Sequence, residues 1–298
     1  MKIALTGATG FVGGRTLDPL LERGHEVRAL TRRARPERDG VTWVSGALDQ
    51  PAGLDTLVAG VDAVLHVAGV VNAPDRAGFV AGNVEGARAV VGAAARAGVR
   101  RFVHVSSLAA REPELSLYGW SKAQAERVVA ASALDWTIVR PPAVYGPGDL
   151  EQLDVFRLAR RGLALLPPPG RMSAIMADDL AALLVSLAER GGPRAIYEPD
   201  DGCPISHADY ARAIGRAVGQ RVLPLPLPAA LLRLGARADR LLRGSRAKLT
   251  PDRARYLAHP DWTVDPARRP PPELWRPRIA LDQGLAEAVR WYRSQGLL

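Results

Sequence analysis

The chain has 298 residues, of which 47% are hydrophobic and 24% charged, a composition typical of a soluble globular protein. Its single cysteine excludes an intrachain disulfide and a cysteine-rich zinc site, and the five histidines show no metal-ligand spacing, so we expect no metal. The net charge of +9 favours anionic partners, but no nucleic-acid-binding motif is visible and only 5% of residues are aromatic. We therefore expect a small molecule or a lipid as partner, and no nucleic acid.

The N-terminus leads from Met1-Lys2 directly into an apolar segment, which predicts that no signal peptide is present. No uninterrupted apolar run approaches the ~18 residues that a membrane-spanning helix needs. These two features predict a cytoplasmic protein.

A short apolar strand at 2–6 is followed by three glycines with the spacing G-x-x-G-x-x-G, and then by a helical segment. The first glycine permits a tight turn, the second lets the backbone approach a pyrophosphate, and the third permits close packing of helix and strand. The N–H groups at the start of the helix would point toward the phosphates. The segment therefore predicts a dinucleotide-binding loop with contacts from Gly7, Thr9, Gly10, Phe11, Val12 and Gly13.

The end of the second strand, expected at 26–31, indicates which nicotinamide cofactor binds. A carboxylate at this position would bind the ribose 2′-hydroxyl of NAD. Here Arg32 and Arg33 follow the strand, and guanidinium groups pair well with a 2′-phosphate. The sequence predicts that NADP(H) is preferred over NAD(H), with Arg32 as the first candidate contact. The alternative interpretation is a solvent-exposed basic loop.

Further strands are expected at 42–45, 61–67, 101–105 and 136–139, and they alternate with helical segments. This alternation predicts an α/β fold, a Rossmann-type doubly wound parallel sheet. Ligands bind such sheets beyond the carboxyl ends of the strands. At those ends the sequence places Ala47, Leu48, Val67, Ala68, Gly69 and Ser107.

The segment Tyr118-Gly119-Trp120-Ser121-Lys122 begins another helix, and a spacing of four puts Tyr118 and Lys122 on one face. A nearby ammonium favours the phenolate, so we expect it to lower the tyrosine pKa and create a group that exchanges a proton with an alcohol or ketone. Alone, the motif also fits a surface pair. However, the chain has only three lysines, at 2, 122 and 248, among many arginines. A lysine with no specific role is therefore less expected at position 122.

In combination, these motifs resemble the extended short-chain dehydrogenase/reductase superfamily of the NAD(P)-dependent epimerase/dehydratase type. The resemblance implies a Rossmann-type fold and a nicotinamide cofactor. The motifs that carry it span most of the chain: Thr6 to Gly13, Asn83 to Gly86, Val105 to Ser107, Tyr118 to Lys122, Arg140 to Pro147, Asp178 to Ala181 and Gly284 to Tyr292.

The resemblance also implies catalytic roles for individual residues. Tyr118 would be the general acid/base, and Lys122 would lower its pKa and hold the nicotinamide ribose. Ser107 would hydrogen-bond the substrate oxygen, with Ser106 as the weaker choice. Asn83 would support a water-mediated proton path, although an asparagine in this place also suits a helix N-cap.

By the same resemblance, residues 1–145 and 172–190 would form the NADP(H)-binding domain. Residues 146–171 and 191–298 would form a smaller, mostly C-terminal substrate-binding subdomain. Pro141 and Val144, close to the first boundary between them, would line the nicotinamide site.

The segment Ala229 to Arg243 predicts a basic amphipathic helix. We favour a helix whose leucine face packs on the core and whose arginine face is solvated. The alternative is a helix that lies on an anionic membrane surface, which would make the protein peripheral to the inner membrane face. The arginine face comprises Arg233, Arg237, Arg240 and Arg243, and the other face comprises Leu231, Leu234, Ala238, Leu241 and Leu242.

Three functions remain open. The first is an NADP(H)-dependent oxidoreductase of a hydrophobic, lipid-like ketone or alcohol such as a 3-keto-ceramide or 3-keto-sphingoid base. It is favoured by the short segment between Ser107 and Tyr118, and by a resemblance of residues 106–113 to a bacterial branch that includes a complex I accessory subunit and ceramide reductase. The second is a nucleotide-sugar epimerase or dehydratase, and the third a non-catalytic nucleotide-binding assembly subunit. Both a monomer and a homodimer are compatible with the sequence.

Overall fold

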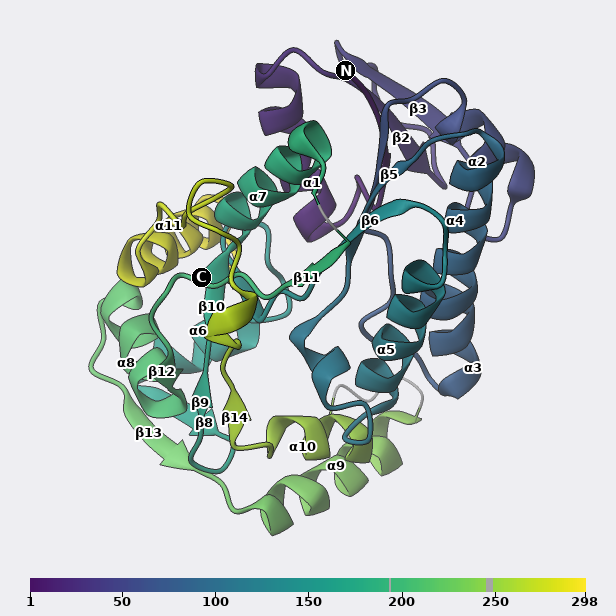
Figure 1. Cartoon of the computed structure of the whole chain (residues 1–298). Coiled ribbons are helices and arrows are strands. Elements are labelled where there is room, and N and C mark those ends of the chain that lie inside the picture. Colours follow the sequence, from purple (N-terminus) through teal and green to yellow (C-terminus); the bar gives the residue numbers. More distant parts are fainter. Residues whose placement is uncertain (193, 245–248) are drawn as a thin grey trace. The chain divides into compact units, whose positions relative to one another are not determined.

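The computed structural model describes residues 1–192, 194–244 and 249–298 (Figure 1). The side chain of Arg240, one of the arginines expected on the amphipathic helix, lies outside the described part. The chain divides into two compact units. The first comprises Met1–Pro141, Asp178–Pro199 and Arg268–Arg276, and the second comprises Pro142–Ala177, Asp200–Ala267 and Pro277–Leu298.

The first unit is built on a seven-stranded sheet with the order β11-β6-β5-β4-β1-β2-β3, in which every neighbouring pair is parallel. The central strands are continuous apolar runs, as expected for strands buried on both faces. The predicted Rossmann-type sheet is therefore confirmed. Its strands are β1 (Lys2–Thr6), β2 (Glu26–Thr31), β3 (Val41–Ser45), β4 (Ala63–His66), β5 (Arg101–Val105), β6 (Asp135–Val139) and β11 (Ala195–Tyr197).

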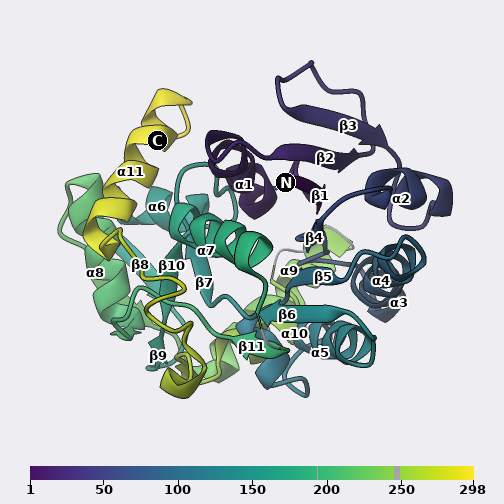
Figure 2. The ribbon, with the colours of Figure 1, turned by 45° about the horizontal axis from the view of Figure 1, so that its top comes forward.

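Helices cover both faces of this sheet. Figure 2 shows α1 (Phe11–Glu22) and α7 (Ala177–Arg190) on one face, and α2 (Pro51–Val58), α4 (Gly86–Arg96) and α5 (Leu117–Ala130) on the other. The core on the second face is apolar and closely packed, and full burial of each large side chain there stabilises the fold by about 1.5–3 kcal/mol. It includes Val64, Phe102 and Ile138 from the strands and Leu57, Val90 and Val129 from the helices.

One helix departs from the expected start. The sequence predicts a helix from Val84 with Asn83 as its N-cap. Instead, α3 (Arg76–Phe79) continues into a π-helical turn, η1 (Val80–Glu85), which runs directly into α4. Asn83 is buried within that turn and does not cap α4. The N-cap prediction is therefore wrong, because the chain does not leave the helical path at this point.

The second unit combines small sheets with helices around its own core. Phe156, Leu285 and Tyr292 are buried in that core, and the Phe156 and Tyr292 rings meet edge to face at 5.0 Å. Its elements are β7 (Ala143–Tyr145), α6 (Leu153–Ala159), β8 (Leu163–Leu166), β9 (Arg171–Met172), β10 (Ala174–Met176), β12 (Ile205–Ser206), α8 (His207–Val218), β13 (Leu223–Pro226), α9 (Ala229–Arg243), α10 (Pro251–Leu257), β14 (Asp261–Trp262), η4 (Pro266–Arg268) and α11 (Leu281–Ser294).

The two units do not follow the boundaries expected from the sequence. Residues 142–145 and 172–177 belong to the second unit, whereas we expected them in the first. Residues 191–199 and 268–276 belong to the first unit, because β11 pairs with β6 and the backbone N–H of Glu198 donates to the carbonyl of Arg268. Such late segments cannot be assigned from local patterns, since their pairing partners are distant in sequence.

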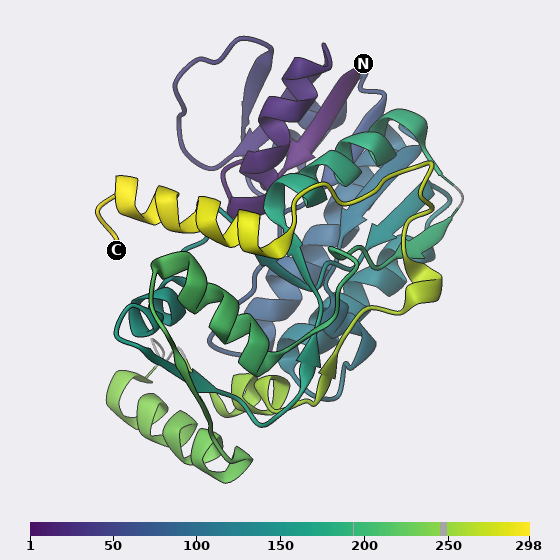
Figure 3. The same ribbon diagram turned by 90° about the vertical axis from the view of Figure 1, so that its left-hand side faces the viewer.

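The helix α9 forms at the predicted residues (Figure 3, light green). It has two apolar sides. Leu232 and Ala236 are buried and pack with Ala254 of α10. Four leucines on the opposite side are between 52% and 87% exposed, so the favoured prediction of a leucine face packed on the core is wrong. They are Leu231, Leu234, Leu241 and Leu242. Among the described helices, none is both long enough and apolar enough to cross a membrane.

Candidate active site

The glycine loop at the end of β1 needs two of its glycines for steric reasons. Gly7 has a φ of +80°, and a Cβ there would lie 2.7 Å from the backbone nitrogen of Ala68. A Cβ on Gly13 would lie 2.1 Å from the carbonyl oxygen of Gly7. These contacts show that the loop after β4 lies against the glycine loop, and that the start of α1 lies against its first turn.

Gly10 differs from the other two glycines. A Cβ there would have one close contact, the Gly7 carbonyl oxygen at 3.3 Å, so the protein itself does not require a glycine. Gly10 is exposed and stands at the N-cap of α1, whose first turn contains no acidic residue. A ligand can thus approach the N–H groups at the positive end of the α1 dipole. This position suits the pyrophosphate of a dinucleotide. Thr9 is exposed beside it, and Phe11 and Val12 are half-buried in the first turn of α1.

The end of β2 carries no carboxylate. Thr31 is buried and uses its hydroxyl to bond the backbone carbonyl of Arg33 at 2.7 Å. The side chains of Arg32 and Arg33 are exposed, and within the described residues neither pairs with a carboxylate. Arg38, further along the same loop, does pair with Asp18. Two free guanidinium groups at this strand end can bind a phosphate.

The helix α5 begins where the sequence predicts, and its start is fixed by two local features. The hydroxyl of Ser116, the N-cap, accepts a hydrogen bond from the backbone N–H of Gly119 at 2.9 Å. A Cβ on Gly119 would lie 2.5 Å from the carbonyl oxygen of Ala109, which belongs to the short 3-10 helix η2 (Leu108–Arg111). The missing side chain therefore allows α5 to lie close to the segment that follows Ser107.

Tyr118 and Ser107 are brought together by this packing. Tyr118 is half-buried and Ser107 is buried. Burial raises the pKa of Tyr118, and the Ser107 hydroxyl, which can hydrogen-bond the phenol, opposes that effect. The expectation that the pKa of Tyr118 is lowered by Lys122 is wrong, because desolvation of the phenol is the largest effect and raises that pKa.

Lys122 is buried one turn further along α5. Its ammonium donates a hydrogen bond to the backbone carbonyl of Val105, the last residue of β5, at 2.8 Å. A Cβ on Gly69 would lie 3.5 Å from the same ammonium. Burial lowers the pKa of Lys122 to about 8, and the negative charge of Glu126 opposes the effect. Lys122 is therefore still mostly protonated at neutral pH.

Asn83 joins three segments around this ammonium. Its side-chain oxygen accepts from the backbone N–H of Val70 at 2.8 Å, and its nitrogen donates to the Val70 carbonyl at 3.0 Å. The nitrogen also donates to the hydroxyl of Ser121 at 2.9 Å. Because a Cβ on Gly69 would lie 2.9 Å from the Asn83 oxygen, Asn83, Gly69 and Lys122 are immediate neighbours.

Two buried histidines lie beneath this group, at the carboxyl ends of β4 and β5. The rings of His66 and His104 stack at 5.2 Å, and His66 Nδ1 lies 2.7 Å from the hydroxyl of Thr6. Burial lowers the pKa of His66 to about 3, and it lowers that of His104 well below the usual value. The charge of Lys122 acts in the same direction on both. Both rings are therefore neutral at neutral pH.

The other predicted contacts are distributed over both units. Ala47, Leu48, Val67 and Ala68 are half-buried and follow β3 or β4, and Leu48 packs on Gly86 of α4. Pro141 ends the first long segment of the first unit and accepts a hydrogen bond from Leu108. Val144 lies on β7 of the second unit, so its assignment to the nicotinamide site stays a prediction.

Sequence reasoning gave no role to several side chains that surround the candidate site. Ser121 bonds Asn83, and Glu126 and Arg140 form a buried ion pair beside Ser106. Glu126 follows Lys122 by four residues on a predicted helix, so its spacing could have placed it on the same face. The pairing with Arg140 has no comparable local pattern.

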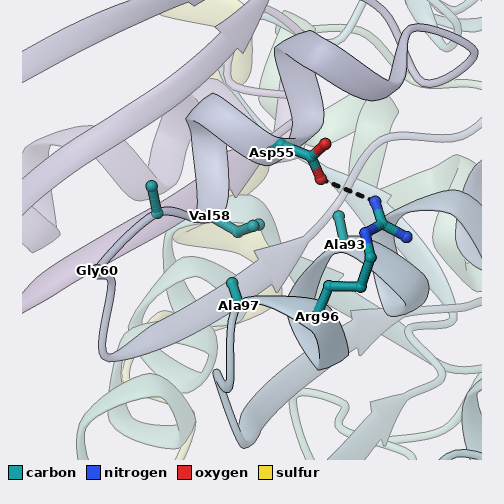
Figure 4. Close-up of a pocket in the computed structure, with 7 residues that line it drawn as sticks. Asp55, Val58, Gly60, Ala93, Arg96 and Ala97 are labelled. Carbon is teal, nitrogen blue, oxygen red and sulfur yellow. Dashed lines mark hydrogen bonds and ion pairs between the residues drawn. The ribbon is translucent and has the colours of Figure 1, made fainter.

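A surface hollow lies away from these residues. It is lined by α2, α4 and the loop before β4, so it opens beside the amino ends of β4 and β5 (Figure 4). Arg96 and Asp55 form an ion pair of 2.7 Å across it. Because ligands of such sheets bind at the opposite, carboxyl ends, we do not assign this hollow to the candidate site.

A family model described as NAD(P)H-binding matches residues 7–190. The chain belongs to this NAD(P)H-binding family. It is 38% identical to the "Ceramide reductase" of Caulobacter vibrioides (strain NA1000 / CB15N), over 99% of this chain and 96% of the relative. It is 33% identical to the "2-alkyl-3-oxoalkanoate reductase" of Stenotrophomonas maltophilia (strain K279a), over 96% of this chain and 97% of the relative.

The solved structure of MoeE5 in complex with UDP-glucose and NAD shares the fold of this NAD(P)H-binding protein. The two have a TM-score of 0.76 and 23% sequence identity, and the match covers 99% of each chain. The expected membership of the extended short-chain dehydrogenases/reductases is thus confirmed. The protein is an NAD(P)-dependent oxidoreductase.

Exchange of single glycines in the loop separates its structural from its binding role. We expect Gly13→Ala to lower the free energy of unfolding by more than about 3 kcal/mol, because its Cβ overlaps the Gly7 carbonyl. We expect Gly10→Ala to leave stability within about 1 kcal/mol and to weaken NADPH binding about tenfold or more. Urea unfolding and titration of NADPH fluorescence measure the two quantities.

Gly14→Ala is the matched control, because its Cβ would lie 3.4 Å from the nearest protein atom, the carbonyl oxygen of Ala8. It should change neither quantity. If Gly10→Ala and Gly14→Ala affected NADPH binding equally, Gly10 would not face the cofactor.

Proposed function

We propose that the protein is an NADP(H)-dependent reductase of a ketone on a hydrophobic, lipid-like substrate, of the 3-keto-ceramide or 3-keto-sphingoid type. The observation that carries the proposal is the hydrogen bond from the buried Lys122 ammonium to the Val105 carbonyl, because it holds the lysine at the strand end that leads to Ser107, one helical turn after Tyr118. Two hydroxyl groups and one cation at a strand end can hold a carbonyl oxygen and supply it with a proton.

Each side chain has a separate task in this proposal. NADPH, when bound, supplies the hydride. Ser107 donates a hydrogen bond to the substrate carbonyl oxygen, and Tyr118 donates the proton that converts it to a hydroxyl. Lys122 holds the nicotinamide ribose and offers a positive charge near the phenolate that remains. Asn83, held by Val70 and Ser121, supports a water-mediated path that returns the proton.

The raised pKa of Tyr118 keeps the phenol protonated at neutral pH, as the proton donor in a ketone reduction must be. A phenol whose pKa lies above its usual value is protonated at neutral pH, so it is ready to donate rather than to accept a proton. Reduction of a ketone consumes that proton. Oxidation of an alcohol would first require the phenol to ionise, which burial disfavours.

The substrate class rests on relatives and on the short connection before Tyr118. Two full-length relatives are named as reductases, of ceramide and of a 2-alkyl-3-oxoalkanoate. The second name places the oxo group on an alkyl chain, at position 3. Between Ser107 and Tyr118 the chain has ten residues, including the turn η2 that packs against α5. A segment this short leaves little chain for contacts to a sugar.

A nucleotide-sugar epimerase is the second candidate, since MoeE5 shares the fold and was solved with UDP-glucose and NAD. A non-catalytic assembly subunit is the third. Such a subunit would not need Ser107, Tyr118 and Lys122 close to one another at the end of β5. Their arrangement therefore argues against it.

We expect purified protein to oxidise NADPH with a 3-keto-ceramide or 3-keto long-chain base, and not with UDP-glucose. Tyr118→Phe should lower kcat at least about 100-fold, because the proton donor is removed, and leave NADPH binding within about twofold. NADPH absorbance measures turnover, and fluorescence titration measures binding. Epimerisation of UDP-glucose without net NADPH use would refute the reductase, and equal activity of Tyr118→Phe would refute the catalytic role.

The preference for NADPH is proposed from the charges at the end of β2. Arg32 and Arg33 are exposed and free to bind a 2′-phosphate, and no carboxylate ends the strand to bind a 2′-hydroxyl or repel the phosphate. Arg32 directly follows the strand, so we assign it the main contact.

We expect Arg32→Ala to weaken NADPH binding about tenfold or more and to change NADH binding less than twofold, because only NADPH carries the 2′-phosphate. Arg38→Ala is the control, since the Arg38 guanidinium is already paired with Asp18. Calorimetric titration with both cofactors measures the effect. Equal weakening of NADPH and NADH by Arg32→Ala would contradict the assignment.

We also propose that α9 contacts an anionic membrane surface, from which a lipid-like substrate would be drawn. The exposed leucines of α9 lie opposite its buried side, at residues 231, 234, 241 and 242. Arg233 and Arg237 are exposed beside this row. An interfacial helix has this arrangement, because its leucines enter the lipid and the neighbouring arginines attract phosphate headgroups.

The strands β8 and β13 add apolar groups just before α9. They pair in parallel, and Leu163, Leu165, Leu223 and Leu225 on them are 37–58% exposed. Leu223 and Leu225 lie on β13, which ends three residues before α9 begins. The exposed apolar groups of this part of the second unit therefore extend beyond a single helix.

We expect the protein to float with vesicles that contain 30% phosphatidylglycerol in phosphatidylcholine, and much less with vesicles of phosphatidylcholine alone. The reason is that each arginine near an anionic surface contributes roughly 1 kcal/mol of binding free energy. Replacement of Leu234, Leu241 and Leu242 by serine should weaken vesicle binding about tenfold or more, because the apolar side chains no longer enter the lipid. Vesicle flotation with quantified bound fractions measures both effects.

Leu150→Ser is the matched control, because Leu150 and Leu234 are both 62% exposed and Leu150 lies outside α9. Binding that does not depend on anionic lipid, or that Leu150→Ser weakens as much as the replacement of the α9 leucines, would refute the proposed membrane contact. A change of oligomeric state in place of vesicle binding would identify a second copy of the chain as the occupant.

A further inference from the structure

The short helix α3 packs against the first turn of α5. Its last residue, Phe79, is 5% exposed, and its ring centroid lies 6.3 Å from that of Tyr118, with the ring planes tilted by 51°. Aromatic rings attract each other at this separation when they are tilted or offset. Phe79 is therefore a direct neighbour of the phenol that donates the proton in the proposed function.

A second contact between the same two helices lies nearer the surface. The Arg76 guanidinium stands over the Trp120 ring, 4.0 Å from the ring centroid. Arg76 is exposed and Trp120 is half-buried. A cation over the face of an indole is attracted by the ring electrons. Because α3 has only four residues, too few for a helix that is stable alone, its position depends on contacts of this kind.

The π-helical turn that follows α3 holds the main chain of the same tyrosine. Asn83 donates a hydrogen bond to the Ser121 hydroxyl at 2.9 Å, and that hydroxyl donates to the Tyr118 carbonyl at 2.8 Å. Asn83 follows Phe79 by four residues, about one turn, so both side chains reach α5 from the same side of the segment. The segment 76–85 therefore contacts the ring of Tyr118 through one residue and its backbone through another.

Features of the chain before and after Phe79 fix where α3 lies. The carboxylate of Asp75, the N-cap of α3, accepts a hydrogen bond from the backbone N–H of Gly78 at 2.9 Å. A Cβ on Gly82 would lie 2.8 Å from both methyl carbons of Val70, so the missing side chain lets η1 approach the loop after β4. Phe79 lies between these two anchored points.

We propose that Phe79 is a positioning residue of the candidate site: its ring packs against the Tyr118 ring and keeps the phenol hydroxyl directed toward the substrate oxygen. A proton donor must stay within hydrogen-bonding reach of its acceptor, and a small displacement lowers the rate strongly. An apolar ring offers the phenol no competing hydrogen bond, and it excludes water from the side that it covers. The kinetic part of this inference rests on the proposed function, whereas the contact between the two rings does not.

The ring contact can be measured without turnover, because the chain has only six tyrosines. In the full-length protein, with tyrosine labelled with 13C at both ε positions, the NMR signal of Tyr118 is identified by its loss in Tyr118→Phe. Phe79→Leu keeps a large apolar side chain but removes the ring and its magnetic effect on neighbouring nuclei. The Tyr118 signal should therefore move more than any other tyrosine signal. An unchanged Tyr118 signal would overturn the inference, whatever the protein catalyses.

Phe156→Leu is the matched control. Phe156 is also buried, and its ring meets that of another tyrosine, Tyr292, in the core of the second unit. This variant should move the Tyr292 signal, identified by its loss in Tyr292→Phe, and leave the Tyr118 signal in place. An equal movement of the Tyr118 signal in Phe79→Leu and Phe156→Leu would reflect a general change of the fold and would refute a local role for Phe79.

Steady-state kinetics with a 3-keto long-chain base separate positioning from stability. Phe79→Ala leaves a gap beside the phenol, so kcat should fall about tenfold or more while KM and NADPH binding stay within about twofold. Phe79→Leu refills the gap and should keep kcat within about threefold of the wild type. A merely structural role would lower the fraction of folded protein and leave kcat per folded molecule unchanged in Phe79→Ala, which would refute the positioning role.

Where Phe79→Ala does not fold, Phe79→Val provides the second test, because it removes less of the side chain. Its kcat should lie below that of Phe79→Leu, and equal kcat values in the two variants would refute the positioning role. Absence of ketone reduction in the wild type, with the Tyr118 signal moved as expected in Phe79→Leu, would refute the reductase and leave the ring contact established.

Discussion

The buried ammonium of Lys122 is the group around which the first unit brings its separate segments together. It donates to the last carbonyl of β5, lies against Gly69 after β4, and shares its surroundings with Asn83 of the π-helical turn. A charge in this place requires polar neighbours on every side. The Val105 carbonyl meets part of that requirement, and His66 and His104, which stay neutral, add no second positive charge beside the ammonium.

Features that depend on local sequence could be predicted. The parallel sheet followed from alternating apolar runs, and the glycine loop from its spacing after a strand. The start of α5 followed from the good helix-forming residues after Tyr118. In each case the signal lies in short runs of neighbouring residues.

Features that depend on contacts distant in sequence could not be predicted. The pKa of Tyr118 is set by burial, which a spacing of four residues does not reveal. Glu126 meets Arg140, and Arg140 meets Glu198, over separations of 14 and 58 residues. The exposure of the α9 leucines cannot be read from the sequence, because amphipathicity alone does not tell which side faces the protein. The same holds for Asn83, whose hydrogen-bond partners lie in a loop and on α5.

The π-helical turn between α3 and α4 has a consequence for how related chains are aligned. A π-turn contains one residue more than an α-turn, so the segment 76–96 is continuous in space but not in helical phase. One residue more or fewer in Val80–Glu85 would rotate every earlier side chain by about 100° relative to α4. An alignment that treats this segment as one uniform α-helix, without a gap, can therefore match the letters around Asn83 and still pair residues that point in different directions.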